Sequence, residues 1–223
     1  MKTILKSLLI ISGLTLLIAS SARADSLTLD PAGDFIPVYA GPQNGDLDVI
    51  STNVSLIGSN FVFSATMNAP IGTTAQAFYI WGVDRGTGAS TANFASIGLP
   101  NIVFDAVVRI NPDGTGLVTL LAPGPPTPTN LPGGSITIFG NTFQVVVPVS
   151  LLPSRGFAPE QYGQNLWPRW GGAVGNAQIS DFAPDANNAS VSAVPEPSTM
   201  ILLGTGLAGV GAAVRKRRQV KGD

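Results

Sequence analysis

The feature that most constrains the fold of this chain is a series of short apolar segments separated by turn-forming residues. Its 223 residues include 26 glycines and 18 prolines, and the runs between them are rich in valine, isoleucine and phenylalanine. The central region contains no long segment with the 3.6-residue apolar period of an amphipathic helix. Many short runs at close spacing favour an all-β protein, and we expect an antiparallel β-sandwich.

Eight segments have the composition of β-strands. They are Leu27–Leu29, Val49–Ile57, Phe61–Met67, Ala77–Val83, Ile102–Ile110, Leu117–Leu121, Ser135–Phe139 and Thr142–Val149. Turn sequences predict hairpins at Asn111–Gly116 and Gly140–Asn141. Ala122–Gly134 contains five prolines and is predicted to be an extended loop. A short helix is expected where Pro159 and Glu160 precede Gln161.

The first 24 residues have the pattern of a secretory signal peptide. Lys2 and Lys6 precede an apolar run, Leu8–Ala19, and small residues at Ala22 and Ala24 form a cleavage site. We expect export through the Sec translocon and cleavage after Ala24 by signal peptidase. The alternative, an uncleaved N-terminal membrane helix, fits less well because the apolar run is short.

The other end of the chain has the pattern of a membrane anchor. After a predicted β-sandwich domain over 25–186 and a flexible linker over 187–194, the final segment, 195–223, begins with Pro195, Glu196 and Pro197. A transmembrane helix is predicted over 199–214 and a basic tail over 215–223. The apolar residues from 200 to 214 span about 22 Å as a helix, which is short for a bilayer core of about 30 Å. This length suggests a temporary anchor.

The charges at the two ends predict the topology of an inner-membrane intermediate. The basic cluster Arg215, Lys216, Arg217 and Arg218 and the lysines of the signal peptide both favour the cytoplasmic side. The domain is therefore expected in the periplasm at this stage, and later at the cell surface or outside the cell.

The tail closely resembles the PEP-CTERM sorting signal of envelope proteins from Gram-negative bacteria. The residues that carry this resemblance are Pro195-Glu196-Pro197-Ser198, the apolar stretch with Leu203-Gly204 and Gly206-Leu207, and the basic cluster 215–218. The resemblance implies that an exosortase processes the chain. It also implies export and an association with exopolysaccharide or biofilm. A plain tail anchor is the alternative.

Composition excludes several classes of function. Residues 25–194 carry four arginines and eleven acidic residues, a formal net charge of −7, which argues against nucleic acid as a partner. The chain has no cysteine and no histidine, so thiol chemistry and histidine-based acid–base catalysis are excluded. We expect no enzymatic activity and no catalytic residues. Glycoside hydrolysis by Glu160 with an aspartate is the weakest alternative.

Acidic residues near the start of the mature chain are candidate metal ligands. Asp30, Asp34, Asp46 and Asp48 lie in glycine-containing segments, where carboxylate oxygens can converge on Ca²⁺. Asp181-Phe-Ala-Pro-Asp185 contains a further pair. The alternative is that these aspartates form turns and caps. The sequence requires no cofactor, and calcium is the one ion that it suggests.

Two aromatic stretches allow two interpretations. Phe78–Trp81 and Tyr162–Trp170 contain all three tryptophans of the chain. Exposed, they would form a platform for sugar rings; buried, they would pack in the core, which is the interpretation that we favour. The sequence therefore predicts an exported structural or adhesive protein of the envelope or extracellular matrix. The alternative is a carbohydrate-binding module, with or without calcium dependence.

Overall fold

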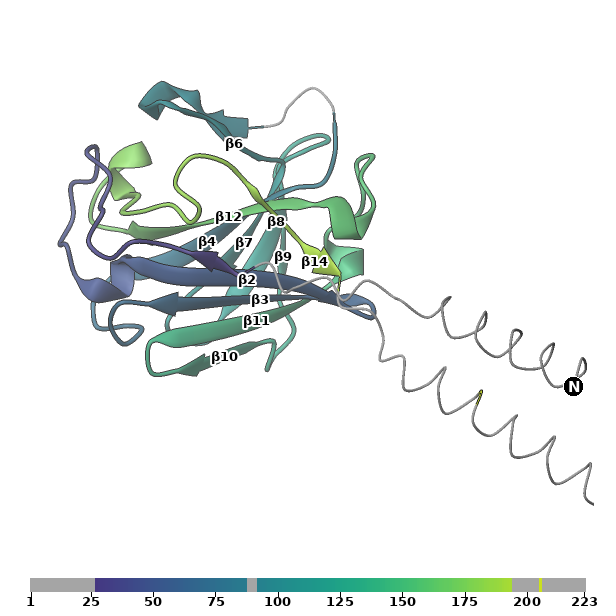
Figure 1. The fold of residues 1–223 in the computed structure, drawn as a ribbon, viewed down its shortest axis with the longest axis horizontal. Helices are drawn as coiled ribbons and strands as arrows, with labels where there is room; N and C mark the ends of the chain where they lie inside the picture. The colour runs from purple at the N-terminus through teal and green to yellow at the C-terminus, as the bar shows by residue number, and fades with distance from the viewer. Residues whose placement is uncertain (1–26, 88–91, 194–204, 206–223) are drawn as a thin grey trace, which may run out of the picture.

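Figure 1 shows the fold in a computed structural model, which describes residues 27–87, 92–193 and 205. These residues form two six-stranded sheets and a separate two-stranded hairpin, so the all-β prediction is confirmed. Strand pairs are antiparallel, except that the last strand pairs in parallel with its neighbour. Within the described residues no helix is long and apolar enough to cross a membrane. The predicted signal peptide, 1–24, lies outside them, as does the predicted membrane span, 199–214, apart from Thr205.

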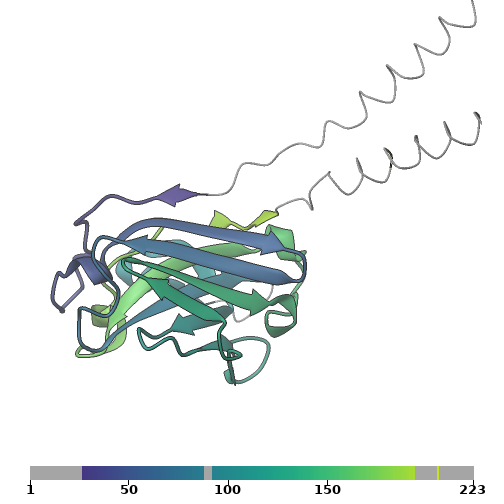
Figure 2. The ribbon, with the colours of Figure 1, turned by 90° about the horizontal axis from the view of Figure 1, so that it is seen from below.

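The first sheet has the strand order β1-β2-β3-β11-β10. Its strands are β1 (Thr28–Leu29), β2 (Val49–Ile57), β3 (Asn60–Met67), β10 (Ile136–Phe139), β11 (Thr142–Pro148) and β14 (Ser192–Ala193). β1 and β14 both pair with β2, opposite Ser51–Thr52 and Ser55–Leu56 respectively. The first and last strands therefore lie along one edge of the same sheet (Figure 2).

The second sheet has the strand order β13-β12-β4-β7-β8-β9. Its strands are β4 (Ala77–Asp84), β7 (Ala106–Ile110), β8 (Gly116–Leu120), β9 (Thr127–Asn130), β12 (Gly163–Trp170) and β13 (Ala189–Ser190). The predicted strand Ile102–Ile110 is divided at Asp105, because residues up to Phe104 belong to a separate hairpin. That hairpin consists of β5 (Ala92–Phe94) and β6 (Leu99–Phe104).

The main core lies between the two sheets. The predicted alternation in β3 is confirmed, because Phe61, Phe63, Ala65 and Met67 are all buried there. They pack with residues from β4 and β11, including Trp81 and Phe143. Both predicted hairpins are also present, between β7 and β8 and between β10 and β11.

A smaller core covers the outer face of the second sheet. Trp167 from β12 packs there against Phe94 and Phe104 of the β5–β6 hairpin and against Phe182. Strands β4 and β12 are thus buried on both faces, which explains the nearly continuous apolar sequence of β4. Figure 1 shows the β6 hairpin on the side of the second sheet that faces away from β2 and β3.

Strand β12 lies inside the sheet although it contains Pro168, and sequence analysis did not predict it. Leu166 exchanges backbone hydrogen bonds with Ala183, and the Pro168 carbonyl accepts one from the Ser180 amide. Residues 166 and 168 therefore direct their backbone groups away from β4. The missing amide of Pro168 interrupts no bond to β4, which is how an interior strand tolerates this proline. Upstream, the short helix expected near Pro159 is the 3-10 turn Pro159–Gln161.

The segment predicted as a flexible linker, 187–194, contains two short strands in its described part, 187–193. β13 and β14 lie in this segment, and Val191 between them is 5% exposed and donates its amide to the Tyr162 carbonyl. Small polar residues suggested a tether, but Ala189–Ser190 pair with β12 of the second sheet and Ser192–Ala193 pair with β2 of the first. The folded domain therefore continues to Ala193.

Candidate metal centre

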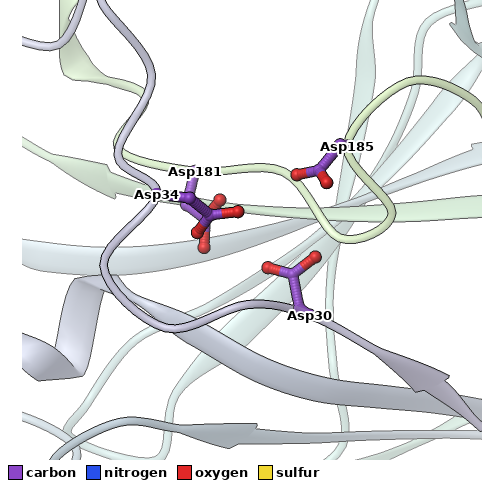
Figure 3. A group of neighbouring side chains, drawn as sticks. All are labelled: Asp30, Asp34, Asp181 and Asp185. Atoms are coloured by element: carbon purple, nitrogen blue, oxygen red, sulfur yellow. The ribbon is translucent and has the colours of Figure 1, made fainter.

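Two short segments with the same spacing of aspartates meet beside the β1 edge. Asp30 and Asp34 belong to the segment that follows β1, and Asp181 and Asp185 belong to the segment between β12 and β13. One carboxylate oxygen from each of the four residues lies within 4.8 Å of the others. Figure 3 shows the four carboxylates directed toward a common space.

Asp181 is the most deeply buried member of this aspartate cluster. It is 1% exposed, and its carboxylate accepts hydrogen bonds from the amides of Val49 (2.8 Å) and Phe182 (2.7 Å). These bonds fix the carboxylate at the end of the sandwich where β2 begins. Asp185, by contrast, is exposed, so the cluster is open to solvent on one side.

Asp30 and Asp34 contribute buried oxygen atoms that have no hydrogen-bond partner. These atoms are Asp30 Oδ2 and Asp34 Oδ1. A buried polar atom without a partner is costly, and a charged oxygen more so. A bound proton or cation would remove the cost of burying these two oxygen atoms without a partner.

The electrostatics of the cluster favour neutralisation. Burial, followed by the charge of Asp30, raises the pKa of Asp181 to about 9. Burial, followed by the charges of Asp185 and Asp34, raises the pKa of Asp30 to about 8. Burial also raises the pKa of Asp34. The carboxylates repel one another in a partly dehydrated space, and a bound cation would remove this cost.

Asp48 is not in the cluster but positions one of its segments. The Gly33 amide donates to both carboxylate oxygens of Asp48, at 3.1 and 3.0 Å, and Asn68 Nδ2 donates at 2.8 Å. Gly33 has a φ of +83°, a left-handed conformation that glycine adopts without strain. Asp48 therefore holds the bend between Asp30 and Asp34.

Asp46 lies elsewhere, in the turn before β2. It is fully buried, and it accepts hydrogen bonds from the amide and the hydroxyl of Thr74. The structure thus groups two of the four predicted ligands, Asp30 and Asp34, with the further pair Asp181 and Asp185. Asp46 and Asp48 have the hydrogen-bonding roles of turn and loop residues.

The arginines of the domain form ion pairs, a cation–π contact and a hydrogen bond that lie away from the aspartate cluster. Arg85 is fully buried and forms an ion pair with Asp105 at 2.7 Å. Arg155 pairs with the same carboxylate at 2.9 Å. Arg109 lies over the Phe78 ring, and Arg169 donates to the Gly175 carbonyl. None of these contacts reaches the four aspartates.

The tryptophans do not form a common exposed surface. Trp81 and Trp167 are 0% and 2% exposed, which agrees with the core-packing interpretation for these two. Trp170, at the end of β12, is half-buried. A cavity lies between the β7–β8 turn and the segment 130–136, and no tryptophan lines it.

The fold and the cluster define a β-sandwich in which carboxylates from both ends of the domain come together. The family described as "PEP-CTERM protein-sorting motif" matches residues 193–218 of the chain. The chain therefore carries this sorting motif, which supports an exported protein that an exosortase processes. No curated protein matches the sequence.

The matched range includes every residue predicted for sorting. Pro195, Glu196, Pro197 and the basic cluster 215–218 all fall within it. These residues, and the predicted cleavage-site residues Ala22 and Ala24, lie outside the described part of the chain. The match begins at Ala193, the last residue of β14, so the sandwich and the motif are contiguous in sequence.

Proposed function

We propose that this protein is a non-enzymatic structural or adhesive component of an exopolysaccharide matrix or biofilm. The observation that carries the proposal is the sorting motif at 193–218, joined directly to a folded β-sandwich. In this proposal an exosortase cleaves the tail after export through the Sec translocon. The mature domain then acts at the cell surface or in the extracellular material.

The order of the elements supports a domain that is already folded when the exosortase cleaves the tail. β14 ends two residues before Pro195, and it pairs with β2 inside the first sheet. During the inner-membrane stage the sandwich would therefore lie close to the membrane surface. Cleavage of the tail would release it without removing the described strands that complete the sheet.

The burial of the tryptophans bears on the alternative function, a carbohydrate-binding module. Trp81 and Trp167 pack in the two cores, so they are not available as stacking surfaces for sugar rings. A platform would have to use other residues. We therefore favour a structural or adhesive role over a sugar site built on these tryptophans.

Fractionation of a biofilm tests the proposed role. Cells that express the wild-type chain are compared with a deletion strain and with the tail variant Glu196→Ala. The wild-type protein is expected in the exopolysaccharide fraction, and its deletion is expected to reduce the mechanical cohesion of the biofilm. The variant Glu160→Gln, which changes an exposed acidic residue of the domain, serves as the control and should behave as wild type.

The result that would contradict the proposal is equally specific. Recovery of the wild-type protein only as a free species in the medium, with cohesion unchanged in the deletion strain, would exclude a structural role in the matrix. Retention of the wild-type protein in the inner membrane would exclude the sorting step instead.

A further inference from the structure

We propose that Asp30, Asp34, Asp181 and Asp185 bind one Ca²⁺, which fastens the N-terminal segment of the domain to the segment that precedes β13. This calcium clamp is defined by the four carboxylates and by the two segments that carry them, 30–34 and 181–185. The proposal concerns the folded domain and does not depend on the sorting route or on a role in the matrix.

The spacing of the oxygen atoms fits one ion of this size. Each of the four residues offers one oxygen, and these oxygens lie within 4.8 Å of one another. Calcium binds oxygen at about 2.3–2.6 Å, so two ligands on opposite sides of the ion are about 4.6–5.2 Å apart. A single Ca²⁺ in the space between the carboxylates can therefore reach all four.

The buried oxygen atoms are a second and independent observation. Asp30 Oδ2 and Asp34 Oδ1 are enclosed by protein and accept no hydrogen bond, whereas both oxygens of Asp181 are directed by backbone amides. Acidic residues that merely cover a surface would have their oxygens in water. Here both oxygens that lack a protein partner are buried, and the carboxylates that carry them are directed toward the other two (Figure 3).

The ligand set selects a hard cation. The four groups supply only carboxylate oxygens, and the chain has no histidine or cysteine to favour zinc or copper. Calcium takes six to eight oxygens, and the exposed side of the cluster at Asp185 can admit water to complete the shell. Magnesium requires closer and more regular octahedral geometry, and it dehydrates reluctantly. Four carboxylate ligands with a side open to water suit calcium better.

The ion would add a further connection between two segments that backbone hydrogen bonds already join. The amide of Ile36 donates to the Ser180 carbonyl at 2.9 Å, and that of Ala40 donates to the Ala177 carbonyl at 3.0 Å. Several side chains of the N-terminal segment are exposed, among them Leu29 and Val38. A clamp at Asp30 and Asp34 would fix this segment across the end of the sandwich. Extracellular modules bind calcium at about 10⁻⁴–10⁻³ M, which suits a domain that works outside the cytoplasm.

A calcium titration of the thermal midpoint tests the clamp. The full-length protein, with its tail, is purified in detergent, treated with EDTA and dialysed, and the Tm is measured from about 0.1 to 10 mM Ca²⁺, with Mg²⁺ as the comparison ion. We expect the Tm to rise with Ca²⁺ and much less with Mg²⁺. Asp34→Asn and Asp185→Asn should each weaken the calcium response by about tenfold or more, because each removes one ligand charge. Glu160→Gln should respond as wild type.

A second measurement distinguishes loss of the clamp from loss of the fold. Without calcium, Asp34→Asn should have a Tm at least equal to that of the wild type, because the substitution removes repulsion within the cluster. Hydrogen exchange should show calcium protecting peptides from 27–40 and 177–187 more than those from β2 and β3. A flat calcium titration of the wild type would overturn the proposal. Equal calcium responses in wild type and both variants would overturn it as well.

Discussion

Two groups of buried carboxylates in this protein differ in whether a positive charge accompanies them. Asp105 accepts from Arg85 Nε at 2.7 Å and from Arg155 Nη1 at 2.9 Å. Arg85 also donates to the carbonyls of Pro153 and Ala122, so one buried guanidinium connects three loops. Asp30 and Asp181 instead face other carboxylates. The first group stabilises the fold by itself, and the second requires a proton or a cation.

The Asp105 group gives the first prediction. Replacement of Asp105 by alanine leaves the fully buried Arg85 without its carboxylate, and we expect the free energy of unfolding to fall by about 3–5 kcal/mol. Urea denaturation of the exported protein measures this change. Asp113→Ala is the matched control, because Asp113 is exposed in the β7–β8 turn and should cost much less. Equal losses of unfolding free energy in the two variants would show that the buried ion pair contributes no more to stability than an exposed turn residue.

The aspartate cluster gives the second prediction, a dependence of stability on pH. The folded state raises the pKa of Asp30, Asp34 and Asp181 above the ordinary value of 3.8, so it binds protons more tightly than the unfolded state does. In EDTA the contribution of these groups to stability is greatest near pH 4 and is lost as the pH rises toward about 9.

Urea titrations between these pH values, in EDTA and in calcium, measure this dependence. Saturating calcium should flatten the fall, because the ion replaces the protons. Asp34→Asn should make the decline in EDTA shallower. A wild-type protein whose stability in EDTA rises over the same range would contradict the raised pKa values.

At the scale of elements, local sequence predicts the strands whose apolar residues alternate or form an uninterrupted run. β2, β3 and β11 were predicted within one or two residues, because alternation and turn residues mark them clearly. β12 was not predicted, because Asn165 and Pro168 interrupt its apolar pattern. β5 and β9 were also missed: β5 has three residues, and β9 is an exposed edge strand in the proline-rich segment.

Contact between β4 and β12 gives the third prediction. Gly82 lies under the ring of Trp167, and a Cβ atom at this position would overlap the ring. We expect Gly82→Ala to destabilise the protein by about 1–3 kcal/mol through overpacking of the outer core. Gly133→Ala is the control, because a Cβ there meets no atom within 4 Å. Thermal unfolding of both variants tests this expectation, and a neutral Gly82→Ala would mean that Trp167 is free to move.

At the scale of the whole molecule, the candidate site depends on a contact between the two ends of the domain. Sequence analysis identified both aspartate pairs, but nothing local indicates that a segment near residue 30 packs against one near residue 181. It included Asp46 and Asp48 because they are close in sequence to Asp34, whereas Thr74 and Gly33 bind them in the structure. The identical spacing of Asp30–Asp34 and Asp181–Asp185 was the one feature of the sequence that related the two pairs to each other.

The positions of the first and last strands also relate the folded domain to the sorting motif. β1 and β14 pair with the same strand, so the chain enters and leaves the sandwich along one edge (Figure 2). The sorting motif begins at that edge, at Ala193. In the proposed route, cleavage at the sorting motif would leave the described strands of the sandwich in place.

The intact mass of the exported protein tests the central claim most directly. It is measured for the form recovered outside the cell, in wild-type cells and in cells that lack the exosortase. The account predicts a chain that begins at Asp25 and has lost the basic cluster 215–218, and no such species without the exosortase. An extracellular protein that retains Arg215–Arg218, or identical masses from both strains, would contradict the account.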